Sequence, residues 1–489
     1  MKKENAGQGT FLRNLFRLQL LNWAVKPLWI LGVETLVQNA LGEAVYGSYF
    51  VVFNFSLLFT IALDFGMNSL ITRELASGVP AHSLWNRSLR LKAAFSLLYL
   101  VITALLGLAQ GMEPALLTAV LLSQLGLQWI LFFRAFLQGT GHSRQDAWFS
   151  VADRLAAMLI ILLALQVGWM EGSRGLLTFA LSQTVSYSLV ALLAFVYVRG
   201  LLKRGTDETA VTVSARSLLQ QGAGLALLSL LMVFYTRLDA LMLRWLHPDG
   251  FFQAGLYARG FRLLDAALIF PILLSTLLLP AFSGVGEKER ERAVKIAGIS
   301  IRLLLAMTAA VAFAAHSWGS EISRLLNPNG LEAEHLATGN ILAWLLTAWV
   351  PMSLIYVYGT WLTAKRKIRL LNLLAGGTLL LNIGLNVWLI PDFGAEAAAW
   401  NVLISQGLFA LGCAVASGLT SIQQLPRLLV GPLAGIGFLY FLGKMLLQTQ
   451  WPWYVQALTG LSAYGLLLLA TGYLPLKGIR FKTQEAGPE

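Results

Sequence analysis

The chain has 489 residues, of which 57% are hydrophobic and 12% are charged, and its mean hydropathy is +0.67. Soluble globular proteins carry about 25% charged residues, so this composition excludes an ordinary soluble protein. The formal net charge of +12 does not require a nucleic-acid partner, because a basic cytoplasmic face next to anionic membrane lipids accounts for most of it.

Apolar runs of about eighteen residues or more recur along the chain. Each run is long enough to cross a hydrocarbon core of roughly 30 Å as a helix, which predicts an all-α, polytopic membrane protein. We expect about fourteen transmembrane helices, at 14–37, 46–70, 88–108, 115–138, 147–169, 175–198, 217–244, 251–281, 295–316, 337–363, 370–390, 395–419, 428–446 and 453–474.

Lysine and arginine are concentrated in alternate loops of this predicted topology. The basic loops include the segments 87–90, 199–204, 288–295, 365–369 and 477–482. The loops between them are mostly acidic and carry Glu43, Glu113, Glu171, Asp249, Glu332, Glu334, Asp392 and Glu396. Because basic loops stay on the cytoplasmic side, both termini are predicted to be cytoplasmic.

A polar connector, GLLKRGTDETAVTVSAR, separates the sixth and seventh predicted helices. The expected parts are an N-terminal six-helix lobe at 1–199, a cytoplasmic linker at 200–216, a second six-helix lobe at 217–420, and two additional helices with a cytoplasmic tail at 421–489. VYGSYFVVF (45–53) and AGLYARGF (254–261) open corresponding helices of the two lobes. Such parallel repeats are a design of membrane transporters, so we expect two pseudo-symmetric lobes.

Charged residues within the apolar segments are the strongest functional signal, because such residues usually face a bundle interior or a water-filled cavity. Arg259, Arg262 and Asp265 fall within about 120° on one face of the helix predicted at 251–281. Asp239, in YTRLDALMLRWL, is predicted to lie at the depth of Arg259, because a short turn joins their helices. The sequence therefore predicts an Asp239–Arg259 pair.

Arg237 precedes Asp239 by two residues, about 200° around the helix, so the two side chains cannot face one point. We expect one of them to face a cavity and the other to hold the bundle together, and the sequence does not decide which.

The first predicted helix has its own charged residues. Lys26 lies near its middle, and Glu34 lies about 80° around the helix and roughly 12 Å further outward. Pro27 is expected to kink this helix or to loosen its hydrogen bonding. Three interpretations of Glu34 stay open: an ion-coupling carboxylate, a partner for Lys26, or a residue of the outer mouth.

A cavity with several cations suits an anion, and arginine matches phosphate oxygens bidentately. The predicted cavity cations are Lys26, Arg237, Arg259 and Arg262. The carboxylates predicted to be able to bind Na⁺ or take up a proton are Glu34, Asp239 and Asp265. Further charged residues are interpreted as structural or interfacial, namely Asp64, Arg73, Arg134, Asp153 and Arg154.

The sequence shows no signature of catalysis or cofactor binding. It has no G-x-x-x-x-G-K-[ST] nucleotide loop, and its five histidines lack the spacing of metal ligands. The single cysteine, Cys413, lies in an apolar run and is interpreted as a core residue. His142 and Asp146 share a basic cytoplasmic turn where we do not expect catalysis. We therefore expect a protein that is not an enzyme and has no cofactor.

Several stretches carry a resemblance to a known family. They are LGEAVYGSYFVVF, LDFGMNSLITREL, TRLDALMLRWL followed by AGLYARGFRLLD, and NLLAGGTLLLNIGLNVWLIPDFGAEAAAWNVLISQ at 372–406. The chain resembles bacterial polysaccharide-biosynthesis membrane proteins, the oligosaccharide flippases or Wzx-type O-antigen translocases. These belong to the multidrug/oligosaccharidyl-lipid/polysaccharide (MOP) exporter superfamily, which includes the MATE transporters. Glu396 departs from the family pattern, which often has a small residue there.

The resemblance implies fourteen helices in two lobes that alternate access to a central cavity. It also implies a polyprenyl-pyrophosphate-linked oligosaccharide as cargo, moved from the inner to the outer leaflet of a bacterial inner membrane for O-antigen or exopolysaccharide synthesis. Na⁺ or H⁺ is the expected coupling ion. The expected partners are the lipid-linked cargo, membrane lipids and a polysaccharide polymerase. The alternatives are a cation-coupled multidrug exporter, a lipid II flippase and a membrane glycosyl polymerase.

Overall fold

The structure, a computed structural model, describes residue 25 and residues 27–202, 215–283, 290–419 and 451–473, with short groups between 430 and 449. All regular elements in this part of the chain are helices, and ten of them are long and apolar enough to cross a membrane. The predicted class, an all-α polytopic membrane protein, is confirmed. The helix predicted at 428–446 falls largely outside the described residues.

The chain divides into two compact units, Met1–Ala266 with Ala375–Ala398 and Ala267–Leu374 with Ala399–Glu489. The predicted division into lobes at a 200–216 linker stays a prediction, since most of that segment lies outside the described residues.

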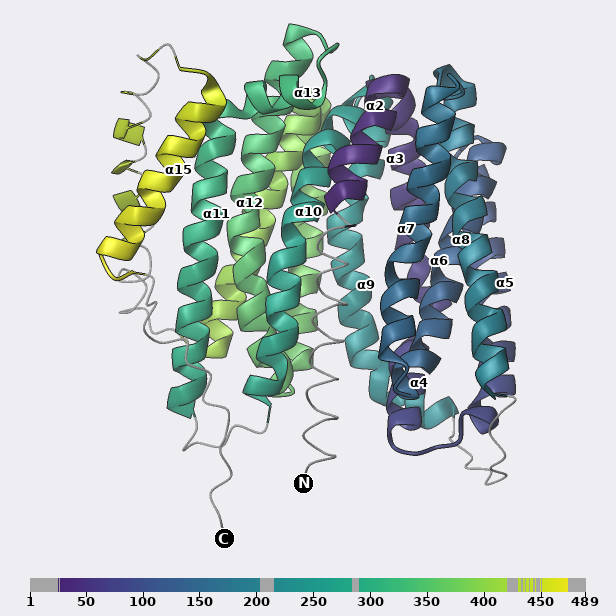
Figure 1. Cartoon of the computed structure of the whole chain (residues 1–489). Helices are drawn as coiled ribbons and strands as arrows, with labels where there is room; N and C mark the ends of the chain where they lie inside the picture. The colour runs from purple at the N-terminus through teal and green to yellow at the C-terminus, as the bar shows by residue number, and fades with distance from the viewer. Residues whose placement is uncertain are drawn as a thin grey trace. The chain divides into compact units, whose positions relative to one another are not determined.

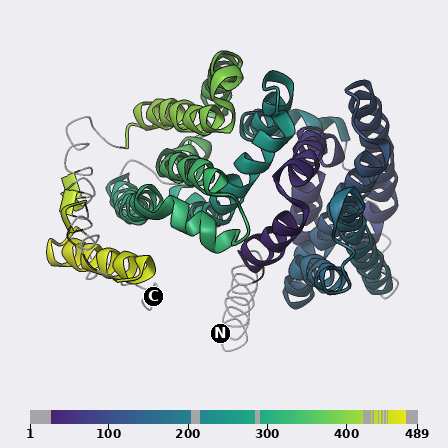
Figure 2. The ribbon, with the colours of Figure 1, turned by 90° about the horizontal axis from the view of Figure 1, so that it is seen from above.

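The first unit contains the helices from η1 to the first half of α10 and a central part of α13 (Figures 1 and 2). In chain order they are η1 (Leu28–Glu34), α2 (Thr35–Leu41), α3 (Glu43–Leu58), η2 (Thr60–Leu63), α4 (Met67–Ala76), α5 (Ala81–Ala109), α6 (Pro114–Gly139), α7 (Ser143–Gln166), α8 (Gly172–Leu202), α9 (Ala215–Leu246), α10 (Gly250–Phe282) and α13 (Ile368–Ser417). Within this unit, α6 packs against α8 and α4, and α9 packs against α3.

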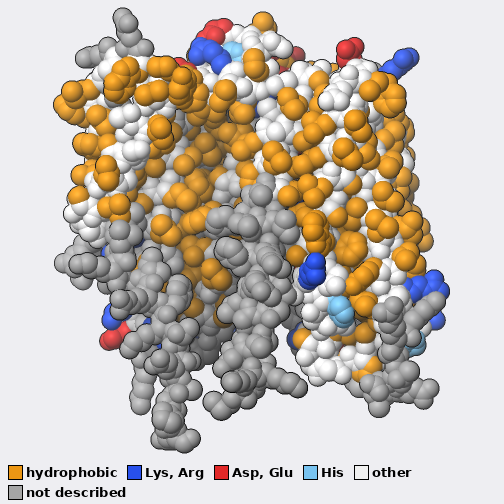
Figure 3. Space-filling view, in the orientation of Figure 1, with side chains coloured by type: hydrophobic (Ala, Val, Ile, Leu, Met, Phe, Trp, Pro, Cys, Tyr) orange, Lys and Arg blue, Asp and Glu red, His pale blue; other side chains and the backbone are white. Residues whose placement is uncertain are grey.

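Aromatic side chains fill the core between α5, α6 and α8. The Trp85 ring lies 5.2 Å from the Phe136 ring and 6.0 Å from the Phe195 ring, centroid to centroid. The outward faces are apolar as well: Leu97 and Leu105 of α5 are each 64% exposed. Apolar side chains cover the visible flanks, while most visible charged side chains lie at the two ends (Figure 3). This pattern is typical of a bundle whose flanks contact lipid tails.

Local irregularities interrupt several of the predicted helices. The segment after Pro27 is a π-helix, which confirms the predicted loosening of hydrogen bonding there. The helix predicted at 46–70 begins at Glu43, because Gly42 has a φ of 78° and ends α2. It is also interrupted by η2 and by positive φ angles at Phe65 (40°) and Gly66 (79°). Such a conformation is strained for a bulky residue such as phenylalanine.

The two helices predicted at 370–390 and 395–419 form one element, α13, with a break between them. Gly394 has φ 55° and ψ −131°, a conformation that favours glycine, and it follows Pro391. In the first unit, the Ala395 backbone N–H donates a hydrogen bond to Gln253 Oε1 across 2.9 Å, which ties this break to α10.

The second unit is built around α11 (Arg290–Leu326) and α12 (Glu332–Ala364), with α15 (Trp453–Ala470) packed on α11. The backbones of α11 and α12 approach closely at Gly319, where an added β-carbon would lie 2.7 Å from the Gly339 carbonyl oxygen. Cys413 is buried in this unit, as its position in an apolar run predicts.

Candidate functional site

The candidate site lies in the first unit, where α3 crosses α10 with almost no space between the two backbones. A β-carbon added to Gly47 of α3 would overlap the Phe251 carbonyl oxygen, and one added to Gly255 of α10 would overlap the Glu43 carbonyl oxygen. Glycine is therefore required at both positions. The crossing brings the first turn of α3 next to the arginines that follow Gly255 on α10.

Arg259 is held at this crossing and is only 3% exposed. Its Nε donates to Glu43 Oε1 across 3.0 Å, its Nη2 also donates to that oxygen, and its Nη1 donates to Asn39 Oδ1 across 2.7 Å. Gln38 Nε2 donates to Glu43 Oε2 across 2.6 Å and to the Gly255 carbonyl across 3.0 Å. The Arg259–Glu43 pair is thus buried and hydrogen-bonded on both sides.

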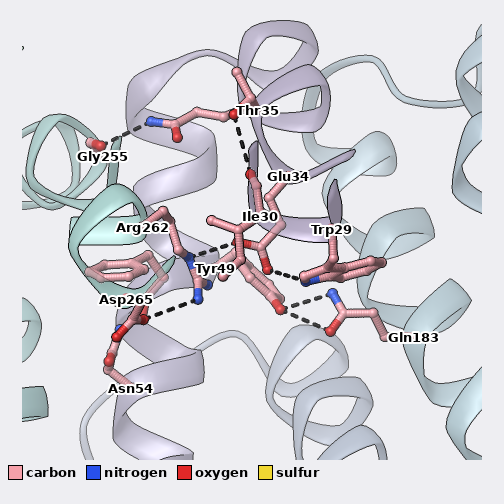
Figure 4. Close-up of polar contacts among 12 residues, drawn as sticks. Trp29, Ile30, Glu34, Thr35, Tyr49, Asn54, Gln183, Gly255, Arg262 and Asp265 are labelled. Atoms are coloured by element: carbon pink, nitrogen blue, oxygen red, sulfur yellow. Dashed lines mark hydrogen bonds and ion pairs between the residues drawn. The ribbon is translucent and has the colours of Figure 1, made fainter. Parts of the chain in front are cut away.

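Arg262 lies one turn further along α10, between two carboxylates (Figure 4). Its Nε is 2.9 Å from Glu34 Oε2, and its Nη1 is 3.9 Å from Asp265 Oδ2. The guanidinium also lies over the Phe50 and Phe53 rings of α3, at 5.4 and 5.1 Å from their centroids. Within the described residues, Arg262 Nη2 is buried without a hydrogen-bond partner.

The π-helix positions Glu34 for this contact. Its wider turn brings residues five apart onto one face, and Trp29 Nε1 donates to Glu34 Oε1 across 2.8 Å (Figure 4). Arg154 of α7, which pairs with Asp153 at 3.3 Å, also attracts Glu34 electrostatically. All three interpretations of Glu34 stay predictions, and its pairing with Lys26 involves a residue outside the described part of the chain.

Arg237 of α9 and Asp265 of α10 form a two-pronged ion pair. Nη1 is 3.1 Å from Asp265 Oδ2 and Nη2 is 3.3 Å from Oδ1. The guanidinium also lies 5.2 Å from the centroid of the Phe261 ring. The two side chains are 23% and 18% exposed, compared with 3% and 4% for Arg259 and Glu43.

Asp239 is fully buried and does not pair with Arg259, so that prediction was wrong. Tyr257 donates to Asp239 Oδ2 across 3.0 Å, and Asn382 and Asn386 of α13 donate to Oδ1 across 3.2 and 2.7 Å. Side-chain direction explains the error, because equal depth on two helices does not mean that the side chains face each other. Both residues join helices: Asp239 contacts α10 and α13, and Arg237 of α9 pairs with Asp265 of α10, so the expected division into one cavity residue and one packing residue stays a prediction.

The residues interpreted as structural have structural contacts. Arg134 Nε is 2.7 Å from Asp146 Oδ1, which joins α6 to α7. Asp64 Oδ1 accepts a hydrogen bond from the Asn68 backbone at the start of α4, across 3.1 Å. Arg73 makes an exposed contact with the adjacent glutamate.

The structure thus brings together most of the charged residues predicted from the sequence and balances their charges; Asp239 lies apart among neutral partners, and Lys26 lies outside the described residues. Three arginines meet three carboxylates along α9, α10, α3 and η1, namely Arg237, Arg259 and Arg262 with Glu34, Glu43 and Asp265. Sequence reasoning missed Glu43, which it assigned to a loop, and the two asparagines that bind Asp239. Chemically, these guanidinium groups can bind an anion if the anion displaces one of the carboxylates that now contact them.

The described helices are those of a multi-pass membrane protein, and charged residues buried among such helices usually mark a functional site. A family model described as "Polysaccharide biosynthesis protein" matches residues 11–285, more than half of the chain. The chain belongs to this family, which confirms the resemblance seen in the sequence.

Solved structures of MOP superfamily transporters share the fold. One described as "Lipid II flippase MurJ, inward closed conformation" aligns with a TM-score of 0.64 and 13% identity over 95% of this chain and 98% of that chain. An inward-facing multidrug resistance MATE family transporter aligns with a TM-score of 0.58 and 15% identity over 82% and 98%. A MOP superfamily transporter from Pyrococcus furiosus, described as having a binding pocket of reverse polarity, aligns at 0.55 and 14% over 83% and 95%. No curated protein sequence matches the chain.

Proposed function

We propose that the protein is a flippase that moves a polyprenyl-pyrophosphate-linked oligosaccharide from the inner to the outer leaflet of a bacterial inner membrane, for surface polysaccharide synthesis. Membership of the family supports a role in polysaccharide biosynthesis, and the fold supports transport by alternating access. Arg237, Arg259 and Arg262, with Lys26, hold the pyrophosphate, while the polyprenyl tail remains in the bilayer.

The observation that carries this proposal is the convergence of three arginines from two helices within the first unit. An isolated charge at mid-bilayer costs roughly 2.5–3.5 kcal/mol on insertion scales, so three together point to a function. Guanidinium groups bind phosphate oxygens in pairs, which suits a pyrophosphate better than an organic cation. In this proposal the substrate replaces some of the carboxylate contacts of the arginines.

Asp239 is the coupling site in this proposal. It is buried in the first unit without a cationic side chain among its described contacts, and neutral groups surround it. A carboxylate in that setting can bind Na⁺ or a proton, because uptake of a cation removes the cost of burying its charge. Binding there couples to the arrangement of α9, α10 and α13, which Asp239 joins.

Two other cargoes compete with this proposal. Lipid II shares the polyprenyl pyrophosphate, and the MurJ-like fold favours it. A cationic drug is favoured by the carboxylates in the network, which equal the arginines in number among the described contacts.

A third alternative is an enzyme. A glycosyl polymerase would transfer sugar, whereas the structural neighbours are transporters and flippases.

Purified protein in liposomes separates these cargoes. The assay measures inward-to-outward movement of a fluorescent polyprenyl-pyrophosphate oligosaccharide, of labelled lipid II and of a cationic dye, together with sugar transfer. A rate of movement of the oligosaccharide lipid that is well above the rates of lipid II and of the dye, without sugar transfer, supports the proposal. Preferential movement of lipid II or of the dye, or sugar transfer, contradicts it.

In the proposed arrangement both termini are cytoplasmic, and a polysaccharide polymerase on the outer side takes the flipped lipid-linked oligosaccharide as its substrate.

A further inference from the structure

Asp265 occupies a position between two arginines from different helices. Arg237 contacts both of its carboxylate oxygens, at 3.1 and 3.3 Å, and Arg262 Nη1 lies 3.9 Å from Oδ2. This is the arrangement in which two guanidinium groups bind a phosphate, with a carboxylate in the phosphate's place. We propose that Asp265 is an internal competitor that holds the substrate's place between Arg237 and Arg262 and so limits how tightly the pyrophosphate binds.

Two features distinguish the site around Asp265, between Arg237 and Arg262, from the Arg259–Glu43 pair. Arg237 and Asp265 are the most exposed, at 23% and 18%, so an anion can reach them more easily than it can reach Arg259 and Glu43, at 3% and 4%. The Arg262 side chain, at 10% exposure, is also less buried than that of Arg259, at 3%, so an anion between Arg237 and Arg262 meets a more accessible pair of guanidinium groups.

The arginines do not need Asp265 to keep their positions. The Arg237 guanidinium lies over Phe261, and the Arg262 guanidinium lies over Phe50 and Phe53. Contacts with aromatic faces stabilise a cation whether or not its carboxylate is present. Release of Asp265 therefore leaves a preformed pair of guanidinium groups and not a collapsed site.

The consequence for transport is a limit on affinity. A flippase must release its cargo on the far side, and a site that binds pyrophosphate too tightly slows release. A carboxylate that returns to both arginines favours departure of the substrate. This inference rests on the proposed function only for the identity of the headgroup, since the competition itself concerns any diphosphate.

The test uses the Asp265→Asn variant of the full-length protein in lipid nanodiscs, with inorganic pyrophosphate as the probe in a calorimetric titration. Asparagine keeps the size of the side chain and removes its charge. We expect Asp265→Asn to bind pyrophosphate about fivefold more tightly than the wild type, a gain at the upper end of what a partly exposed ion pair represents. Adding Arg237→Ala to Asp265→Asn is expected to remove the gain.

Glu332→Gln is the matched control, because Glu332 also pairs with an arginine, Arg324, but at an exposed position and with no second arginine among its contacts in the described residues. It changes the net charge equally and is expected to leave pyrophosphate affinity unchanged. Unchanged or weaker binding by Asp265→Asn, with a wild-type unfolding temperature, overturns the inference. An equal gain in Glu332→Gln overturns it too, because net charge alone would then explain the effect.

The liposome assay separates this result from the proposed function. If Asp265→Asn gains pyrophosphate affinity while the wild type moves no oligosaccharide lipid, the competition stands and the proposed cargo is wrong. If the wild type moves the lipid and Asp265→Asn gains no affinity, the cargo stands and Asp265 is not a competitor.

Discussion

Gly47 of α3 and Gly255 of α10 lie at one helix crossing, where a β-carbon on Gly47 would come 2.8 Å from the Gly255 backbone nitrogen. The crossing sets the distance between Glu43 and Arg259. Real β-carbons do not approach backbone atoms so closely, so this arrangement of the two helices depends on glycine at both positions.

Gly255→Ala is therefore expected to destabilise the observed arrangement and to lower flipping at least about tenfold, because α3 and α10 must separate. Gly298→Ala is the matched control, since a β-carbon there meets nothing within 4 Å. Unfolding temperature and flipping rate in liposomes measure both effects. Wild-type behaviour of Gly255→Ala in both measurements would show that the crossing is not tight.

The Glu43–Arg259 pair allows stability and transport to be separated. Glu43→Gln leaves a buried arginine without its counter-charge, which is expected to cost about 3–5 kcal/mol of stability. The double variant Glu43→Met with Arg259→Met is expected to recover most of that stability, because apolar pairs often replace buried ion pairs without loss. If Arg259 binds cargo, the double variant folds and does not flip. A double variant with wild-type flipping contradicts a role for Arg259 in binding.

Asp239 is predicted to couple transport to an ion gradient. Asp239→Asn removes the charge, so its flipping rate is expected not to respond to an imposed Na⁺ or proton gradient, whereas the wild-type rate responds to one of them. Asn386→Ala, which deletes the 2.7 Å donor to Asp239, is expected to cost about 1.5–3 kcal/mol of stability. Asp265→Asn serves as the comparison and is expected to keep the gradient response. A gradient response retained in Asp239→Asn would assign coupling elsewhere.

The predicted topology is testable because the lone cysteine, Cys413, is buried. Ser77→Cys lies in a predicted cytoplasmic loop and Gln110→Cys in a predicted outer loop, and both positions are exposed. In intact cells, a membrane-impermeant maleimide is expected to label Gln110→Cys and not Ser77→Cys. The reverse pattern would place the termini outside.

The sequence predicted the class of fold and the charged positions for a simple physical reason. Charges are costly in apolar helices, so Arg237, Arg259, Arg262 and Asp265 stand out without any structural information. The change in helical hydrogen bonding after Pro27 was also predictable, since proline removes a helical hydrogen bond.

The pairing within the site could not be predicted in the same way. Depth along a helix follows from counting residues, but the facing side chain depends on helix rotation and on which helix lies alongside. Asp239 meets Asn386, 147 residues further along the chain, which no local pattern indicates. Glu43 was missed because it lies one residue after Gly42, where the sequence suggested a loop and the structure begins α3.

The central claim, that these arginines hold the pyrophosphate of the cargo, is tested most directly by the flipping of a fluorescent polyprenyl-pyrophosphate oligosaccharide in liposomes by Arg237→Ala and Arg262→Ala. Arg324→Ala, an exposed arginine of the second unit, is the control. The account predicts at least about tenfold slower flipping by both site variants and a wild-type rate for the control. Wild-type flipping by both site variants, in folded protein, would contradict it.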